Sequence, residues 1–277
     1  MEVSEELVWK IDSVDGHVVS EWRFKNRATP SRTSFFGFTE FNAQPAFIKL
    51  ANPGSQYNST LIEKEIEILK ALNHLNVVKP LASGWHKFRT ILDDVINVPY
   101  IIMPAYASDL EDLIISNGLR KWEDFIIIAQ EVFESIKYIH QVGVIHGDIC
   151  PANILIGAQP QKGTASFKLC DFGASIKIGE CVSLRRGAMY YHTPPDEHLS
   201  FGFDWFSFGV LLSRLSSRDD IWHWFISSRN QALTFHPWVP VPAQDALTEA
   251  IKSFTSHCPG ERESYSNVFI SSIRGWK

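Results

Sequence analysis

Two short polar segments near the middle of the chain contain side chains that could carry out chemistry. Residues 146–153 read His-Gly-Asp-Ile-Cys-Pro-Ala-Asn, and Asp171-Phe172-Gly173 begins eighteen residues after Asn153. Asn153 and Asp171 offer amide and carboxylate oxygens, which magnesium prefers as ligands, and Asp148 offers a candidate base. Phosphoryl transfer uses these three groups. Its transition state is loose, so the protein contributes mainly by positioning the reactants and neutralising their charge. The spacing therefore predicts phosphoryl transfer from a nucleotide.

The local sequence around the two segments strengthens this prediction. Residues 154–156 and 167–170 read as short apolar strands that follow Asn153 and lead into Asp171. In order and spacing, the two segments resemble the catalytic loop, H-R-D-x-x-x-x-N, and the magnesium loop, D-F-G, of eukaryotic-type protein kinases. Each motif alone could be an ordinary polar turn, so the argument depends on their joint occurrence.

The elements along the chain predict an α+β fold with two lobes. The first hundred residues mix strand-like segments with one amphipathic helix, and later residues read mostly as helices. The resemblance implies the protein kinase fold, an N-terminal antiparallel sheet plus one helix followed by a mainly helical lobe. We place the lobes at residues 1–103 and 104–277, together one kinase domain. The expected strands are 18–24, 34–39, 46–50, 77–81 and 100–103, and the expected helices are 60–73 and 122–140.

The resemblance also implies a lysine that holds the nucleotide phosphates and a glutamate that holds the lysine. Lys49 in Ala46-Phe47-Ile48-Lys49 resembles the family's V-A-I-K lysine, and Glu65 matches the register of the helical glutamate. Glu63 and Glu67 face other directions on a 3.6-residue period. The alternative is a surface lysine beside a solvated charged helix.

Two more segments carry family features. Met103, Pro104 and Tyr106 lie in a segment that resembles the hinge that binds adenine, where the Pro104 carbonyl can still accept a hydrogen bond. Residues 204–209, Asp-Trp-Phe-Ser-Phe-Gly, resemble the family's D-x-W-S-F-G, whose aspartate supports the catalytic loop from a buried helix. Residues 187–197 resemble the end of the family's activation segment, which normally closes on Ala-Pro-Glu, but Pro195 stands where glutamate is usual, so we expect Arg262 to pair with Asp196 or Glu197.

Three departures from the family bear on turnover. Residues 27–33 occupy the place of the glycine-rich phosphate loop and contain no glycine. Gly147 replaces the arginine that anchors a phosphorylated activation segment, so activity should not depend on such phosphorylation. Cys150 stands where Ser/Thr kinases place a lysine near the γ-phosphate, and a thiol supplies no positive charge.

These features leave three functions open. The first is an ATP- and magnesium-dependent protein kinase that phosphorylates serine or threonine of a protein substrate, with Asp148, Lys49 and Glu65 as catalytic residues and Asn153 and Asp171 on the metal. Serine/threonine is favoured because the catalytic loop lacks the tyrosine-kinase pattern. The second is a weakly active or inactive kinase-fold regulator of a partner protein. The third is a small-molecule phosphotransferase of the aminoglycoside type, which would lack the activation segment and the Asp204 helix motif.

Composition limits the partners and the compartment. A net charge of −5 gives no basic field for nucleic acid, and no apolar run approaches the ~20 residues that span a bilayer. The acidic start of the chain does not resemble a secretory signal, so we expect an intracellular, cytoplasmic protein, with the nucleus left open as an alternative. The four cysteines, Cys150, Cys170, Cys181 and Cys258, are expected to be free thiols. The sequence does not indicate an oligomeric state.

Overall fold

The computed structural model divides the chain into two units, and each is described by itself. Unit 1 contains residues 1–73 and 78–105, and unit 2 contains residues 74–77 and 106–277. The lobe boundary that we predict between Met103 and Pro104 remains a proposal. The structure describes residues 13–23, 34–53, 56–89, 94–157, 167–180, 199–218 and 232–274.

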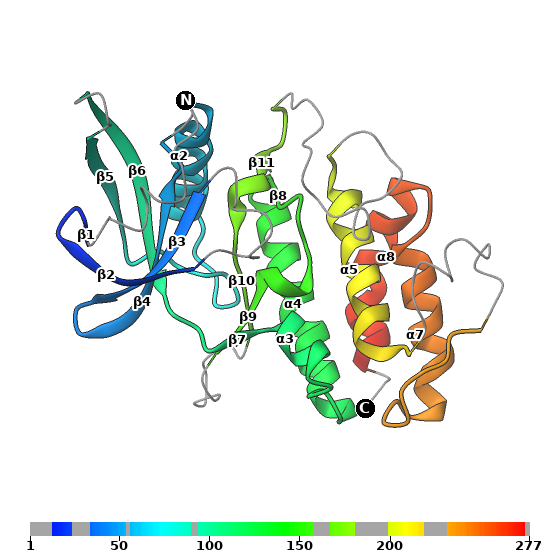
Figure 1. Cartoon of the computed structure of the whole chain (residues 1–277). Helices are drawn as coiled ribbons and strands as arrows, with labels where there is room; N and C mark the ends of the chain where they lie inside the picture. The colour runs from blue at the N-terminus through cyan, green and yellow to red at the C-terminus, as the bar shows by residue number, and fades with distance from the viewer. Residues whose placement is uncertain are drawn as a thin grey trace. The chain divides into compact units, whose positions relative to one another are not determined.

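Unit 1 is built on an antiparallel sheet with the strand order β1-β2-β3-β4-β6-β5 (Figure 1). Its strands are β1 (Ser13–Val14), β2 (His17–Arg23), β3 (Ser34–Phe41), β4 (Gln44–Ala51), β5 (Ala82–Arg89) and β6 (Val95–Pro104). Neighbouring strands in the chain form hairpins, except that β6 lies between β4 and β5. Alternate apolar residues of these strands, such as Ile48, Leu50 and Ile102, form the core of the unit.

One helix of unit 1, α2 (Gln56–Ala71), packs on this sheet. The buried residues Ile62, Glu65, Ile68 and Leu69 recur at helical spacing, so one face of α2 is turned inward. The predicted helix over 60–73 is present, and it begins four residues earlier and ends two residues earlier than expected. Near its start, the side chain of Asn58 donates a hydrogen bond to the Asn52 carbonyl at 3.1 Å.

The strand that we predict over residues 77–81 is wrong. Val77 forms an isolated parallel bridge with Leu169, within unit 2, and the strand that pairs with β6 is β5, five residues further along. Pro80 has no N–H group for a sheet ladder, and the sheet begins only where Leu81 donates to the Ile102 carbonyl at 2.8 Å. The segment is therefore a connection between the two units.

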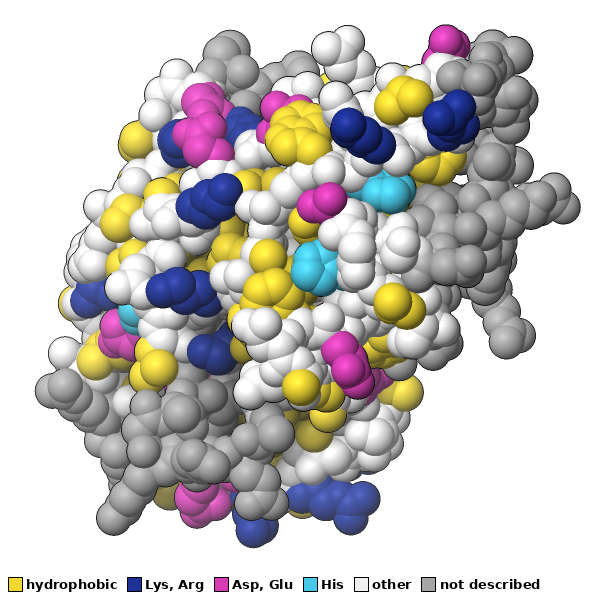
Figure 2. All heavy atoms as spheres, turned by 90° about the vertical axis from the view of Figure 1, so that its left-hand side faces the viewer, with side chains coloured by type: hydrophobic (Ala, Val, Ile, Leu, Met, Phe, Trp, Pro, Cys, Tyr) yellow, Lys and Arg dark blue, Asp and Glu magenta, His cyan; other side chains and the backbone are white. Residues whose placement is uncertain are grey.

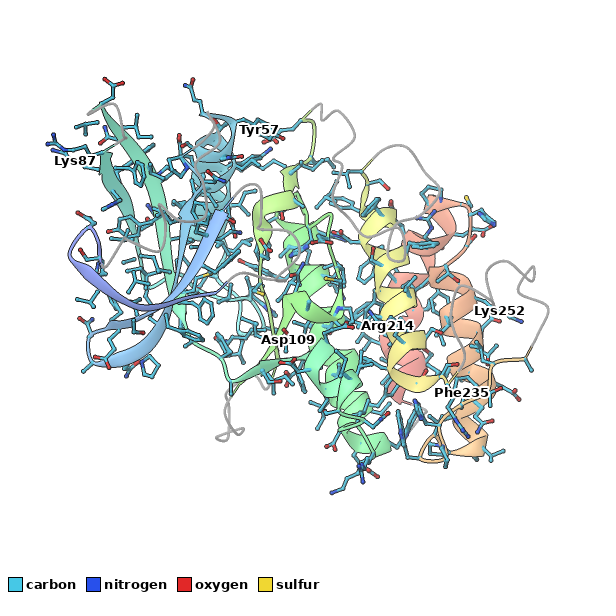
Figure 3. The ribbon with its side chains drawn as sticks, in the orientation of Figure 1. Tyr57, Lys87, Asp109, Arg214, Phe235 and Lys252 are labelled. Carbon is cyan, nitrogen blue, oxygen red and sulfur yellow. The ribbon has the colours of Figure 1, made fainter. Side chains whose placement is uncertain are left out.

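Unit 2 is mainly helical. Its described helices are α3 (Leu110–Ile115), α4 (Trp122–Gln141), α5 (Phe201–Ser216), α7 (Val241–Phe254) and α8 (Pro259–Arg274). The predicted helix over 122–140 is confirmed as α4. Helices α5, α7 and α8 lie side by side (Figure 1), and the rings of Phe133, Phe208, Phe254 and Phe269 contact one another between them and α4. Arg214 of α5, labelled in Figure 3, donates to Glu111 of α3 at 2.8 Å, and this contact joins α3 to α5.

Short strands and 3-10 turns of unit 2 frame the two polar segments. The strands are β7 (Ser108–Asp109), β8 (Val144–Ile145), β9 (Ile154–Ile156), β10 (Phe167–Leu169) and β11 (Ile176–Lys177), and the turns are η1 (Pro151–Asn153) and η2 (Phe172–Ala174). Strand β9 lies between β10 and β7, and β8 pairs with β11. Both predicted short strands, 154–156 and 167–170, are present, the second ending at Leu169. Among the described helices, none is both long and apolar enough to cross a membrane.

Candidate active site

Lys49 and Glu65 form a buried ion pair inside unit 1. Lys49 lies in β4, between Phe36 of β3 and Ile101 of β6, and its Nζ atom is 2.7 Å from Oε2 of Glu65. The exposed fractions are 4% for Lys49 and 0% for Glu65, so water solvates neither charge appreciably. Glu65 reaches Lys49 because it shares the inward face of α2 with Ile62 and Leu69. The pair holds the ammonium group at one fixed place in the sheet.

Asp148 and Asn153 are brought together in unit 2. The side-chain Nδ2 of Asn153 donates to both the carbonyl and the Oδ2 of Asp148, each at 2.9 Å. The turn η1 makes this possible, because Pro151 at its first position has no N–H to satisfy and the Asn153 N–H donates to the Cys150 carbonyl at 3.0 Å. Since Nδ2 faces Asp148, the amide oxygen of Asn153 is the atom left to bind a cation.

Asp171 is placed beside this loop by the backbone. The N–H of Cys170 donates to the Asn153 carbonyl at 2.9 Å, and Nε2 of His146 contacts the Cys170 carbonyl at 3.0 Å. Asp171 has a φ angle of 61°, a left-handed conformation that aspartate tolerates better than most side chains. The sequence predicts functional roles for Asp148, Asn153 and Asp171. These three residues therefore belong to one local structure.

The backbone of the loop is attached to the buried carboxylate of Asp204 in α5. Oδ2 of Asp204 accepts from the N–H of His146 at 2.8 Å, and Oδ1 accepts from the N–H of Gly147 at 2.9 Å. Asp204 is fully buried, and it also contacts Nε2 of His140 at 2.8 Å. Charge-assisted bonds of this kind are about twice as strong as neutral ones, so α5 fixes the start of the loop.

His140 and Ser175 belong to this arrangement, and sequence reasoning did not identify them. The His140 ring lies against Phe201 and Trp205 of α5 while contacting Asp204, and Ser175 Oγ donates to the His146 carbonyl at 3.0 Å. The one available signal for His140 is a polar residue near the end of a helix that is apolar over much of its circumference. Ser175 gives no such signal.

The residues predicted to contact adenine are divided between the units. Met103 and Pro104 pair with Phe47 and Ala46 at the end of β6, in unit 1. Tyr106 belongs to unit 2, where burial, with a smaller contribution from Cys170, raises the pKa of its hydroxyl to about 12. The Tyr106 hydroxyl is therefore neutral, and able to donate a hydrogen bond, over the physiological pH range.

Some sequence predictions fall outside the described residues. These are the glycine-less segment 27–33, Cys181, and the carboxylates Asp196 and Glu197. Arg262, expected to pair with one of them, is fully buried and donates to the carbonyls of Gly202 at 2.8 Å and Ser256 at 2.7 Å. Cys150, Cys170 and Cys258, within the described residues, are free thiols, as expected.

The oxygen atoms around Asp148 suit magnesium. Within the described ranges, no group of three His, Cys, Asp or Glu side chains could hold a metal ion by itself. Magnesium is usually held by one or two protein oxygens, water and substrate phosphates rather than by an all-protein cage. The amide of Asn153 and the carboxylate of Asp171 fit that pattern. When bound there with a nucleotide, magnesium would supply charge neutralisation at the phosphates.

Comparison with known proteins identifies the family. A model of the protein kinase domain matches residues 42–267. A probable serine/threonine-protein kinase of Dictyostelium discoideum is 25% identical over 233 residues, which cover 81% of this chain and 37% of that protein. The mouse inhibitor of nuclear factor kappa-B kinase subunit epsilon is 30% identical over 139 residues, 48% of this chain and 18% of the relative. The mitogen-activated protein kinase HOG1 of Arthrobotrys oligospora is 33% identical over 132 residues, 47% of this chain and 33% of the relative.

The matches to these relatives span a third or less of their length in two cases and 37% in the third. The family model, by contrast, covers most of the present sequence, including Lys49, Glu65, the loop from His146 to Asn153, and Asp171. Fold and family agree, since a sheet with one helix and a mainly helical unit are the parts expected of this domain. The chain belongs to the protein kinase family.

Proposed function

We propose that the chain transfers the γ-phosphate of ATP to serine or threonine hydroxyls of a protein substrate in the cytoplasm. The observation that carries this proposal is the contact between Asn153 Nδ2 and Asp148 Oδ2 at 2.9 Å, in a loop attached to buried Asp204. It orients one carboxylate oxygen of Asp148 and leaves the Asn153 amide oxygen for a metal ion. Proteins catalyse phosphoryl transfer mainly by positioning of this kind.

Each predicted residue has a role in this proposal. Asp148 accepts a hydrogen bond from the substrate hydroxyl and orients it, and Asn153 and Asp171 hold magnesium. Lys49, fixed by Glu65 at 2.7 Å, binds the nucleotide phosphates as a point charge. Met103, Pro104 and Tyr106 contact the adenine ring.

A second function is favoured by one residue, Cys150. It follows the candidate base by two positions, where a lysine would neutralise charge on the transferring phosphate. Without that charge, the chain would bind ATP and magnesium and act on a partner protein with little or no transfer. The two functions share the nucleotide site and differ only in turnover.

The deciding experiment incubates the purified chain with γ-labelled ATP, magnesium and a mixed protein substrate. We expect label on serine and threonine, and a fall of at least about 100-fold when Asp148→Asn removes the carboxylate that orients the hydroxyl. Asp171→Ala supplies the blank, and Asp245→Asn, an exposed residue of α7, is the control for a conservative surface change.

The same samples separate the alternatives. If the label is no higher than in the Asp171→Ala variant, the chain is not an active kinase. Stabilisation against heat by ATP and magnesium would then support the second function. Label on aminoglycosides or sugars, with none on protein, would instead identify a small-molecule phosphotransferase.

A further inference from the structure

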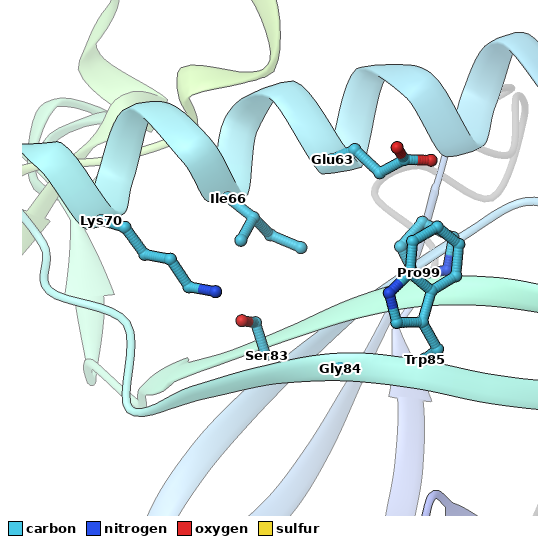
Figure 4. Close-up of a pocket in the computed structure, with 7 residues that line it drawn as sticks. All are labelled: Glu63, Ile66, Lys70, Ser83, Gly84, Trp85 and Pro99. Carbon is cyan, nitrogen blue, oxygen red and sulfur yellow. The ribbon is translucent and has the colours of Figure 1, made fainter.

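A pocket in unit 1 lies between α2 and the edge of the sheet, apart from every residue assigned to the nucleotide or the metal. Figure 4 shows its lining: Glu63, Ile66 and Lys70 of α2, Ser83, Gly84 and Trp85 of β5, and Pro99 of β6. The three helix positions recur at helical spacing, so they share one face. Ser83 and Trp85 are two apart on one strand, and Pro99 is directly opposite Trp85, so these side chains share a face of the sheet.

The middle of the pocket is apolar. Ile66 is half-buried, Pro99 is buried, and the Trp85 side chain is 50% exposed. The cavity volume is about 220 Å³, below the roughly 300–1,000 Å³ that small-molecule sites occupy. This volume suits a single large side chain of a protein partner better than a separate small molecule. An accessible tryptophan is also a favoured centre of protein interfaces.

The two ends of the pocket carry opposite charges. Figure 4 shows the Lys70 ammonium group directed toward Ser83, and the Glu63 carboxylate at the end formed by Trp85 and Pro99. Seven residues of helix separate them by roughly 10 Å along the axis. Within the described ranges, neither side chain takes part in an ion pair or a side-chain hydrogen bond. An occupant with a carboxylate at one end and a cation at the other would complement both.

The strand beside the pocket, β5, could form a sheet pairing with a peptide that occupies the pocket. In the described sheet β5 is the terminal strand, so its outer N–H and C=O groups face no further strand. On the face that Figure 2 shows, lysine and arginine side chains lie among exposed hydrophobic ones. A peptide that pairs with an edge strand is extended and points alternate side chains to the same face. Alternate side chains of such a peptide would enter the pocket.

We propose that this α2–β5 pocket binds an extended segment of a partner protein with the pattern acidic-x-apolar-x-basic, in either chain direction. The carboxylate pairs with Lys70, the large apolar side chain fills the space between Ile66 and Trp85, and the basic side chain pairs with Glu63 and lies near the Trp85 ring. Four residues of strand span about 13 Å, which the flexible ends of Lys70 and Glu63 accommodate. The test of this site needs no kinase activity.

The first test selects ligands from a displayed library of random linear peptides, using the full chain and counter-selecting against the Trp85→Ala variant. We expect enrichment of the acidic-x-apolar-x-basic pattern or of its reverse order. No enrichment over the counter-selection, or enriched peptides without the two charges, would overturn the proposal. Thermal unfolding of the variant confirms that it is folded, which is expected because Trp85 is half-exposed.

The second test exchanges the charges. With a labelled synthetic peptide from the selection, Lys70→Glu and Glu63→Lys should each weaken binding at least about tenfold, measured by fluorescence anisotropy. The double variant should bind the same peptide with its acidic and basic residues exchanged. Lys79→Glu, at an exposed lysine of unit 1 outside the pocket, should leave binding unchanged. Failure of the exchanged peptide to bind the double variant, or dimerisation of the chain that Trp85→Ala abolishes, would contradict a peptide site.

Discussion

Lys49 and Glu65 are both almost fully buried, so each charge depends on the other for the solvation that burial has removed. Lys49→Met should therefore lower the free energy of unfolding by about 3–5 kcal/mol, because Glu65 is left as a buried charge without its ammonium partner. The double variant Lys49→Met, Glu65→Leu should regain much of this loss. Urea denaturation measures all three proteins, and a double variant no more stable than Lys49→Met would contradict the argument.

Gly147 allows the loop a backbone conformation that other residues reach only with strain. Its φ angle is +77°, and a Cβ atom there would lie 3.1 Å from the Ala174 carbonyl oxygen. Gly147→Ala should lower the free energy of unfolding by about 1–2 kcal/mol. The control is Gly260→Ala in α8, where a Cβ would meet nothing within 4 Å, and it should be neutral or stabilising. Equal effects of the two changes in urea denaturation would refute this account.

Substitutions at Cys150 test whether the lack of a positive charge at this position limits the rate of phosphoryl transfer. If the proposed kinase reaction occurs, Cys150→Lys should raise the rate of label transfer at least about tenfold, because an ammonium group near the phosphate stabilises the transition state more than a thiol does. Cys150→Ser removes the thiol without adding charge and is the matched control. A lysine variant no faster than the serine variant would place the limit elsewhere.

At the scale of elements, α5 acts as the support of the catalytic loop through one side chain. Asp204 accepts two backbone N–H bonds and contacts His140 of α4, so two helices and the loop meet at one carboxylate. Both helices are apolar over much of their surface, which buries this meeting point and strengthens its electrostatic interactions. Loop position is therefore set by the packing of α4 and α5 as well as by the loop's own sequence.

The substitution Asp204→Asn should weaken the support of the catalytic loop while the helices of unit 2 stay folded. The amide keeps the shape but loses the charge, so the free energy of unfolding should fall by about 1.5–3 kcal/mol. The amides of His146 and Gly147 should exchange hydrogen faster than in the unchanged chain, while amides in α7 and α8 should not. Asp245→Asn, an exposed aspartate of α7, is the control. Unchanged exchange at both loop amides would show that Asp204 does not hold the loop.

At the scale of the whole molecule, three histidines make stability depend on pH. Burial lowers the pKa of His74, His86 and His236 below 6.5. In His74 and His86, Nδ1 accepts a backbone N–H, from Asn76 at 3.1 Å and from Asp15 at 3.2 Å, which requires an unprotonated nitrogen. The unfolded chain therefore binds protons at higher pH than the folded chain does. The stability from these neutral rings is complete above pH 6.5 and decreases as the pH falls through their lowered pKa values.

The expected result is a free energy of unfolding that decreases from pH 7 to pH 5.5. Replacing all three histidines with glutamine should flatten this dependence, since glutamine does not titrate. Urea denaturation at several pH values compares the two proteins. An equally steep dependence in the triple variant would assign the effect to other groups.

Sequence patterns could predict the parts whose causes are local. The inward position of Glu65 follows from its spacing to Ile62 and Leu69, and α4 follows from its apolar periodicity. The strand predicted over 77–81 failed because Val77 and Val78 are buried as expected but Val77 pairs with Leu169, while Leu81 is 38% exposed. Periodicity reports that a face is buried and does not report what covers it.

The sequence by itself determined the chemistry that the chain can offer, because Asp148, Asn153 and Asp171 are identified by their types and short spacing, and the loop around Asn153 closes through near neighbours. The resemblance of residues 204–209 to a family motif indicated Asp204 as a support of the loop, and only the tertiary structure decided which groups it holds and which residues join it. The Asp204 carboxylate reaches Gly147 across 57 positions of sequence, and His140 joins them from a third element. Such contacts depend on how whole helices pack, a property of the assembled core that no local pattern of residues specifies.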